Sequence, residues 1–223
     1  MPSTETKPLK ERNNMGTRGA IGFRLDGQDK VTYNHFDSYP SGVGAELLTE
    51  LCGIKNWEAV KTAVRNITFI DQNEPPTEEQ IELCAEFTDL GVGDQSTSDW
   101  YCLLRGAQGS LAPYLTGKLP FMSDNHTFLL ASVFCEYAYI VNLDDMTLEF
   151  YKGFNKDNKL AGRYASKSKA KGQGRLPTEE YFGVVLMEAM PLADLPKTKR
   201  GKGFVIKTVK RWDDLCHDPE DDE

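Results

Sequence analysis

Residues 19–33 read GAIGFRLDGQDKVTY. Two short apolar runs flank the dipeptide Asp26-Gly27, and the second residue of such a dipeptide tolerates a positive φ angle. This pattern predicts a β-hairpin with its turn at or around the dipeptide. The second strand leads directly into a polar and aromatic loop, NHFDSYPSG, at residues 34–42.

A second hairpin is predicted further along the chain. Residues 136–143 (EYAYIVNL) and 147–152 (TLEFYK) alternate apolar and polar side chains, which is typical of paired strands. Between the hairpins we expect several helices, including residues 57–64 and a segment capped by Thr77, and we expect a last strand at residues 204–209. The sequence therefore predicts an α+β fold, a single domain whose mostly antiparallel sheet is built from two hairpins with several helices packed on it.

Composition limits the class of protein. Of the 223 residues, 39% are hydrophobic and 27% charged, which excludes intrinsic disorder, and no apolar run approaches the length of a membrane helix. The five cysteines are scattered without a CxxC pair, and the first residues lack the apolar core of a secretory signal. We therefore expect a cytoplasmic protein with no membrane partner.

The expected organisation has three parts. Residues 1–14 are predicted to be a disordered leader, residues 15–212 the single α+β domain and residues 213–223 an acidic tail. Within the domain, residues 154–175 carry many basic and few apolar side chains and are predicted to form a mobile loop.

The net charge of −8 is the sum of two unlike parts. Residues 1–150 carry 22 acidic and 11 basic residues, whereas residues 151–223 carry 12 acidic and 15 basic residues. The overall charge gives no support to nucleic-acid binding, but the basic segments keep it open locally. In that interpretation Lys167, Lys169, Lys171 and Arg175 would follow a phosphate backbone.

The first hairpin brings a polar cluster together. If its strands pair, Thr17 and Arg18 before the first strand lie at the same end as His35 and Asp37 after the second. Arg18 would then bind an anion together with Ser41, Gly42 and Gly44, whose backbone would form the beginning of a helix.

The same cluster is also compatible with catalysis. His35 would act as a general base that Asp37 or Tyr39 orients. Thr17 would be the nucleophile of an N-terminal-nucleophile hydrolase only if the chain were cleaved before it. The alternative is structural, because Asn, Asp, Ser and Pro are also the usual residues of turns and caps.

No other motif predicts a reaction. The sequence lacks the phosphate-binding GxxxxGK[ST] loop, the GxSxG elbow and the HExxH metal motif. A site of three histidines would need His35, His126 and His217 together, and His217 falls near the predicted tail. We therefore expect neither a metal nor a cofactor.

Two segments of the cluster, MGTRGAIGF and YNHFDSYPSGVG, resemble short uncharacterised open reading frames of bacteriophages and their hosts. That family begins with Met-x-Thr-Arg and continues with His-x-Asp-Gly-Tyr-Pro and a glycine; a later segment, EYAYIVNLDDMTLEFYKG, resembles its hairpin. The resemblance covers roughly residues 15–50 and 135–153 and implies a phage-associated accessory protein, without naming a reaction. The matching positions are Thr17, Arg18, His35, Asp37, Tyr39, Pro40 and Gly44, with Ser38 in place of the family's glycine.

The expected function is accordingly that of a cytosolic accessory protein with a ligand-binding or hydrolytic site around Arg18, His35, Asp37 and Tyr39. Its partner would be a small anionic ligand or a host protein. The alternative is a non-enzymatic binding protein, which would use the basic loops for nucleic acid or an acidic helix face to inhibit a host protein. The acidic face would consist of Glu78, Glu79, Glu82 and Glu86.

Overall fold

The first predicted hairpin is confirmed. A computed structural model describes residues 16–157, 161–166, 181–198 and 201–217. In it β1 (Gly19–Leu25) pairs antiparallel with β2 (Gln28–Asn34). The turn consists of Asp26 and Gly27 alone, with φ angles of 52° and 76°, so both residues adopt the left-handed conformation that a two-residue hairpin turn requires.

The second hairpin is also confirmed, and it lies at the centre of the sheet. Strands β5 (Tyr137–Asn142) and β6 (Thr147–Lys152) pair antiparallel, and β7 (Val185–Pro191) adds to β6. The five-stranded order is β2-β1-β5-β6-β7, in which β1 and β5 are parallel and pair Gly19 with Tyr137. Because the other three pairs are antiparallel, the predicted α+β class with a mostly antiparallel sheet is confirmed.

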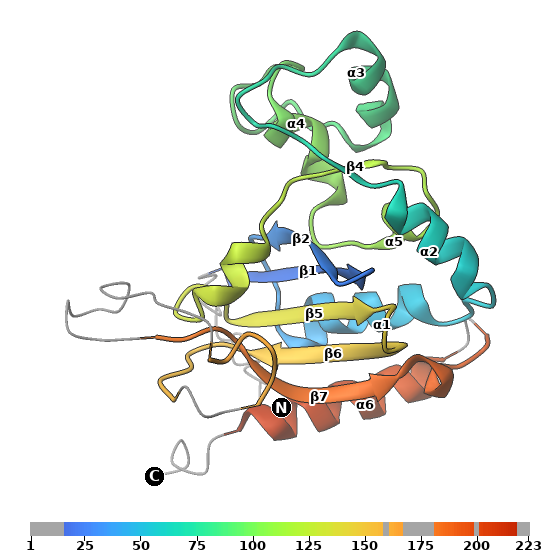
Figure 1. Ribbon diagram of the computed structural model, residues 1–223, viewed down its shortest axis with the longest axis vertical. Coiled ribbons are helices and arrows are strands. Elements are labelled where there is room, and N and C mark those ends of the chain that lie inside the picture. The colour runs from blue at the N-terminus through green and yellow to red at the C-terminus, as the bar shows by residue number, and fades with distance from the viewer. Residues whose placement is uncertain (1–15, 158–160, 167–180, 199–200, 218–223) are drawn as a thin grey trace, which may run out of the picture.

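One face of the sheet is covered by α1 (Ala45–Leu51) and α6 (Lys202–Cys216), as Figure 1 shows. The predicted strand at residues 204–209 is therefore wrong, because this segment is part of α6. Its inward side chains, Phe204, Thr208 and Trp212, recur every four residues, which is the period of a helix. The β-branched residues of this segment favour a strand when considered alone, whereas Trp212 continues the helical face that Phe204 and Thr208 begin.

Most of the remaining elements lie beyond the β2 edge, except the short turns η1 (Pro40–Gly44), which packs with α1 and α6, and η5 (Leu192–Asp194), which follows β7. Helix α2 (Trp57–Arg65) ends against β2, where the buried ammonium of Lys30 donates to the carbonyl oxygens of Val64, Arg65 and Ile67 at 2.7–3.2 Å and so caps the helix. The others are β3 (Thr68–Phe69), α3 (Glu78–Cys84), α4 (Trp100–Leu104), α5 (Ala112–Leu115), β4 (Phe121–Met122) and the short helical turns η2 (Ala85–Phe87), η3 (Arg105–Ala107) and η4 (His126–Leu130).

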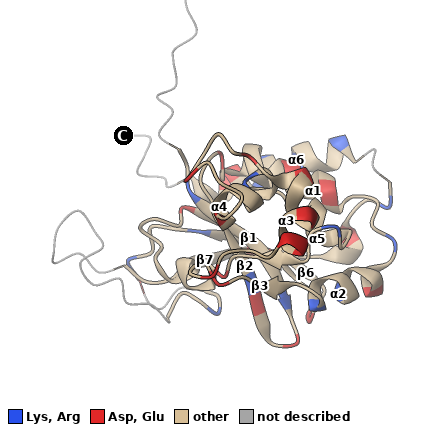
Figure 2. Ribbon diagram, turned by 90° about the horizontal axis from the view of Figure 1, so that it is seen from above, with Lys and Arg blue, Asp and Glu red and all other residues tan. Residues whose placement is uncertain are grey.

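We call residues 71–107 the α3–α4 lobe, because Figure 1 shows them standing away from the sheet. Thr77 caps α3 in the predicted way, with its hydroxyl accepting from Gln80 N and its own N–H donating to the Gln80 side chain. Figure 2 marks the acidic positions of α3 in red, and Glu78, Glu79 and Glu82 are all exposed.

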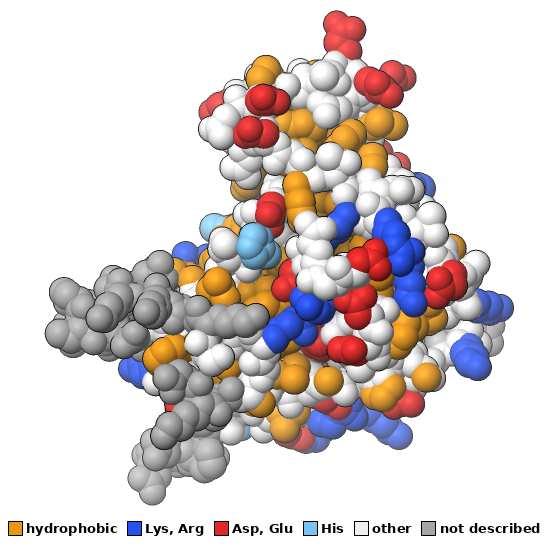
Figure 3. Space-filling model, in the orientation of Figure 1, with side chains coloured by type: hydrophobic (Ala, Val, Ile, Leu, Met, Phe, Trp, Pro, Cys, Tyr) orange, Lys and Arg blue, Asp and Glu red, His pale blue; other side chains and the backbone are white. Residues whose placement is uncertain are grey.

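The opposite face of the sheet carries a charged network over its middle, where Figure 3 shows acidic and basic side chains intermixed. Glu149 is 5% exposed and accepts from Asn142 at 2.8 Å, from Tyr151 at 2.8 Å and from Arg163 at 2.6 Å. Arg163 also lies 3.6 Å from Asp29. A residue of the predicted basic loop is thus fixed on the sheet by ion pairs.

Several predicted boundaries fall outside the described residues. The leader at residues 1–14 and the acidic residues after 217 are among them, as are parts of the basic loop. Helix α6 runs to Cys216 and so continues past residue 212, where we placed the end of the domain. Within the described residues, no helix combines the length and the apolar character that crossing a bilayer requires.

We expect Tyr139→Phe to lower the free energy of unfolding by about 1–3 kcal/mol, because the buried Tyr139 hydroxyl donates to Ser38 O at 3.0 Å and its loss leaves that carbonyl unpaired. The measurement is urea denaturation followed by tryptophan fluorescence. Tyr137→Phe is the matched control, since Tyr137 lies on the same strand and face but its hydroxyl has no hydrogen bond among the described residues. Equal destabilisation by both variants would contradict this role of Tyr139.

Candidate functional site

Hydrogen bonds from a buried side chain hold the loop after β2, residues 34–44. Asn34 is 5% exposed, and its side-chain amide donates to Phe36 O and, at 2.7 Å, to Ser38 Oγ. Ser38 N donates to Thr17 O at 3.1 Å, which joins the two ends of the hairpin as the sequence predicts. These hydrogen bonds fix the conformation of the loop that carries His35 and Phe36.

The predicted cluster does not form a single hydrogen-bonded unit. The His35 ring nitrogen Nδ1 lies 2.6 Å from the Tyr33 hydroxyl, and the Asp37 carboxylate accepts from Tyr39 at 3.2 Å. The Arg18 guanidinium lies over the Phe134 ring at 5.5 Å. Among the described residues, no hydrogen bond or ion pair joins Arg18, His35 and Asp37 to one another. The partner that orients His35 is thus Tyr33.

The predicted anion site at the start of a helix is closed. Ser41 is exposed and makes no side-chain cap, and Gly42 has a non-helical backbone. The N–H groups of Gly42 and Gly44 donate to Tyr39 O at 3.0 and 3.4 Å, and that of Val43 donates to Asp37 O at 2.8 Å. Because these three N–H groups are satisfied within the loop, they are not free to bind an anion.

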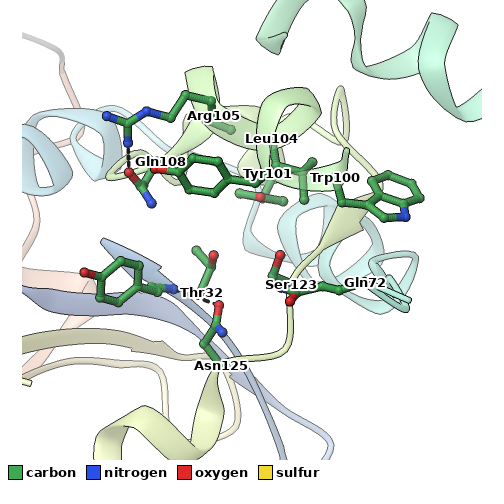
Figure 4. A pocket seen from close by; sticks show the side chains of 12 residues that line it. Thr32, Gln72, Trp100, Tyr101, Leu104, Arg105, Gln108, Ser123 and Asn125 are labelled. Carbon is green, nitrogen blue, oxygen red and sulfur yellow. Dashed lines mark hydrogen bonds between the residues drawn. The ribbon is translucent and has the colours of Figure 1, made fainter. Parts of the chain in front are cut away.

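A cavity of about 140 Å³ lies where the α3–α4 lobe meets β2. Figure 4 shows side chains of α4 and η3 on one side of it and those of β2 and of the segments after β3 and β4 on the other. None of its lining residues is acidic. They are Thr32, Tyr33, Gln72, Trp100, Tyr101, Leu104, Arg105, Ala107, Gln108, Tyr114, Ser123 and Asn125.

Arg105 supplies the positive charge of this cavity. Its guanidinium lies 5.9 Å from the centre of the Phe36 ring and 5.8 Å from that of Tyr101, and it donates to the Gln108 side-chain oxygen. Within the described part of the chain, no carboxylate lies within ion-pair distance of it. Aromatic contacts hold the cation in place without neutralising it.

Most of the polar groups free to meet a ligand are donors. Asn125 Oδ1 accepts from Tyr33 N at 3.1 Å and Gln108 Oε1 accepts from Arg105, so the NH₂ groups of both amides remain. The hydroxyls of Thr32 and Ser123 have no hydrogen-bond partner among the described residues. The cavity therefore suits a ligand that offers hydrogen-bond acceptors.

Two arginines act on the tyrosine at the rim of this cavity. Burial raises the pKa of the Tyr33 hydroxyl, and the positive charges of Arg18 and Arg105 partly offset that rise. Arg18, which the sequence singled out, and Arg105, which it did not, therefore both lie near Tyr33. Arg105 had one sequence signal, since it is the only basic residue between Arg65 and Lys118.

A second hollow adjoins the first. It has a volume of about 320 Å³, shares Arg105 and Gln108 with the cavity, and is lined by Asp37, Glu46 and Asp89. Asp37 thus lines this acidic hollow and not the cavity.

The other predicted binding residues fall into two groups. Lys167, Lys169, Lys171 and Arg175 lie outside the described residues, whereas Glu78, Glu79, Glu82 and Glu86 are exposed on the lobe. Within residues 16–157, 161–166, 181–198 and 201–217, no three His, Cys, Asp or Glu side chains gather as a metal site would require.

We expect Asn34→Ala to destabilise the protein by about 1–3 kcal/mol, because a buried amide with two loop contacts is lost. Hydrogen exchange should be faster at Ser38 N and Val43 N, whose hydrogen bonds hold the loop. Asn73→Ala, at an exposed turn, is the control and should change stability by less than about 0.5 kcal/mol. Unchanged exchange at both amides would show that Asn34 does not hold the loop.

Comparison of the chain with protein-family models, with curated proteins and with solved structures finds no match in any of the three.

Proposed function

We propose that the protein binds a small planar ligand, anionic or rich in hydrogen-bond acceptors, in the cavity between β2 and α4. The observation that carries this proposal is Arg105, a cation held between the Phe36 and Tyr101 rings and facing no carboxylate partner among the described residues. A positive charge in this setting is stabilised by an incoming anion, and the flat rings beside it favour a planar molecule.

The size of the cavity limits the ligand. A cavity of about 150 Å³ accommodates a benzene ring in other proteins, and the one described here measures about 140 Å³. The bound portion of the ligand is therefore a single six-membered ring, with its anionic group toward Arg105 at the mouth. The resemblance to phage reading frames supports placing this binding function in a phage-associated accessory protein.

The test is isothermal titration with benzoate, orotate and uridine 5′-monophosphate. At least one probe should bind, and Arg105→Gln should weaken its binding at least tenfold, because the variant loses the charge-assisted contact, worth about 1.5–3 kcal/mol. Lys207→Gln makes the same change of charge on the exposed surface of α6 and should have no effect. Absence of binding by every probe, or equal binding by both variants, would contradict the proposal.

Hydrolysis beside this cavity is the second candidate, and the 2.6 Å contact between His35 Nδ1 and the hydroxyl of the cavity-lining Tyr33 favours it. If Nδ1 carries the proton and donates it to the tyrosine oxygen, Nε2 is unprotonated and can accept a proton from water. Nε2 has no hydrogen-bond partner among the described residues.

For this candidate we expect wild-type protein to hydrolyse one of a panel of chromogenic carboxylic and phosphoric esters. His35→Gln should lower turnover by about 10²–10⁴-fold, the usual contribution of a general base, and should leave binding of the same ester unchanged. His126→Gln is the control, since the His126 ring pairs with Asp124 and not with Tyr33. No turnover by the wild type would leave binding alone as the function.

A further inference from the structure

The cavity opens onto a surface where aromatic rings and arginines alternate. Arg105 contacts both Tyr101 and Phe36, and the Phe36 ring lies 4.2 Å from the ring of His35, edge to face. The His35 ring lies 5.9 Å from that of Tyr33. Gly16 packs against the Phe36 ring, and Arg18, two residues further on, continues the series to Phe134, whose ring centre lies 5.5 Å from the guanidinium. We call this the aromatic–arginine strip, which consists of Arg18, Tyr33, His35, Phe36, Tyr101, Arg105 and Phe134.

The strip is exposed where a soluble domain normally buries its rings. Phe36 is 48% exposed, Tyr101 46% and Phe134 37%. Apart from these three, the large exposed hydrophobic side chains of the described residues do not take part in such a series. Half-exposed rings that alternate with cations present flat faces and positive charge to the same ligand.

Neither arginine of the strip is neutralised. Like Arg105, Arg18 forms no ion pair with a described carboxylate, because Glu136 accepts from the backbone N–H of Arg18 and not from its guanidinium. Both charges therefore remain for a ligand that carries more than one negative group.

We propose that the ligand of this site is single-stranded nucleic acid, with one base in the cavity, neighbouring bases stacked along the strip and phosphates on Arg105 and Arg18. The inference rests on the proposed function and extends it from a ring-bearing anion to a strand. Base stacking on aromatic side chains together with cations along the backbone is the general mode of single-strand binding. A cavity for one ring requires an unpaired base, so duplex nucleic acid does not fit.

The neighbouring acidic hollow fixes the course of the strand. Asp37, Glu46 and Asp89 line that hollow together with Phe36 and Arg105. Because these carboxylates would repel phosphates, the strand leaves Arg105 toward Arg18 and Phe134. This path uses only described residues and is independent of Lys167, Lys169, Lys171 and Arg175.

The experiment measures fluorescence anisotropy of labelled oligo(dT) and oligo(rU) of about eight nucleotides, with a duplex of the same length as the comparison and uridine 5′-monophosphate as the short ligand. The wild-type protein should bind a single strand at least tenfold more tightly than the monophosphate and the duplex. Phe36→Ala and Arg18→Ala should each weaken strand binding about tenfold, and Arg18→Ala should lower the salt dependence by about 0.7 in logarithmic slope.

Ile206→Ala and Lys207→Ala are the matched controls, because they remove an exposed apolar side chain and an exposed charge on α6. Both should leave strand binding unchanged.

The outcomes separate the two proposals. Monophosphate binding without a tighter strand complex would overturn the nucleic-acid inference and leave the cavity as a small-ligand site. Strand binding that survives Phe36→Ala and Arg18→Ala would also overturn it, because the contact would then lie elsewhere. If a strand binds through the strip while the monophosphate, orotate and benzoate all fail to bind, the proposed function of the cavity is contradicted but the nucleic-acid inference is not.

Discussion

The hydroxyl of Tyr139 links the loop at residues 34–44 to the sheet. Tyr139 lies in the central strand β5, and its hydroxyl donates to the carbonyl of Ser38. The centre of its ring lies 5.4 Å from that of Phe150, on which it stacks, and 5.6 Å from that of Trp212 in α6. Gly44 packs against the same ring so closely that a Cβ atom there would lie 2.9 Å from the Tyr139 hydroxyl oxygen. One side chain thus joins the sheet, α6 and the loop that carries His35 and Phe36.

Ion pairs and hydrogen bonds stabilise the opposite face of the sheet, whereas aromatic packing stabilises the face that carries Tyr139. Glu149 is surrounded by donors from Asn142, Tyr151 and Arg163, and Asp29 accepts from Arg24 at 3.0 Å. Burying charges is unfavourable unless each is paired, so such a network stabilises one arrangement of partners over others. Here Arg163 pairs with Glu149 of β6 and lies 3.6 Å from Asp29 of β2, which fixes residues 161–166 on this face of the sheet.

Local patterns predicted the local structure well. Asp26-Gly27 identified the first turn, and Thr77 with Gln80 identified the start of α3, because both depend on neighbouring residues alone. The hairpin also predicted that the residues before β1 and after β2 lie at the same end, and Ser38 N donates to Thr17 O there. Arg105 was missed because its importance comes from Phe36 and Tyr101, which the fold brings to it from separate segments. Residues 71–105 contain nine acidic residues and Arg105 alone as a base, and an isolated cation of this kind is the signal to look for.

The parallel pairing of β1 with β5 has a consequence for the order of folding. Gly19 and Tyr137, which lie opposite each other, are 118 residues apart in sequence, whereas each hairpin forms between neighbours. Closing so long a loop loses conformational entropy, which only the contacts between β1 and β5 offset. We therefore expect the two hairpins to form before β1 and β5 pair. During synthesis the residues of the 34–44 loop leave the ribosome long before Tyr139 does. The loop that carries His35 and Phe36 therefore gains its contact with Tyr139 only after more than half of the chain has been made.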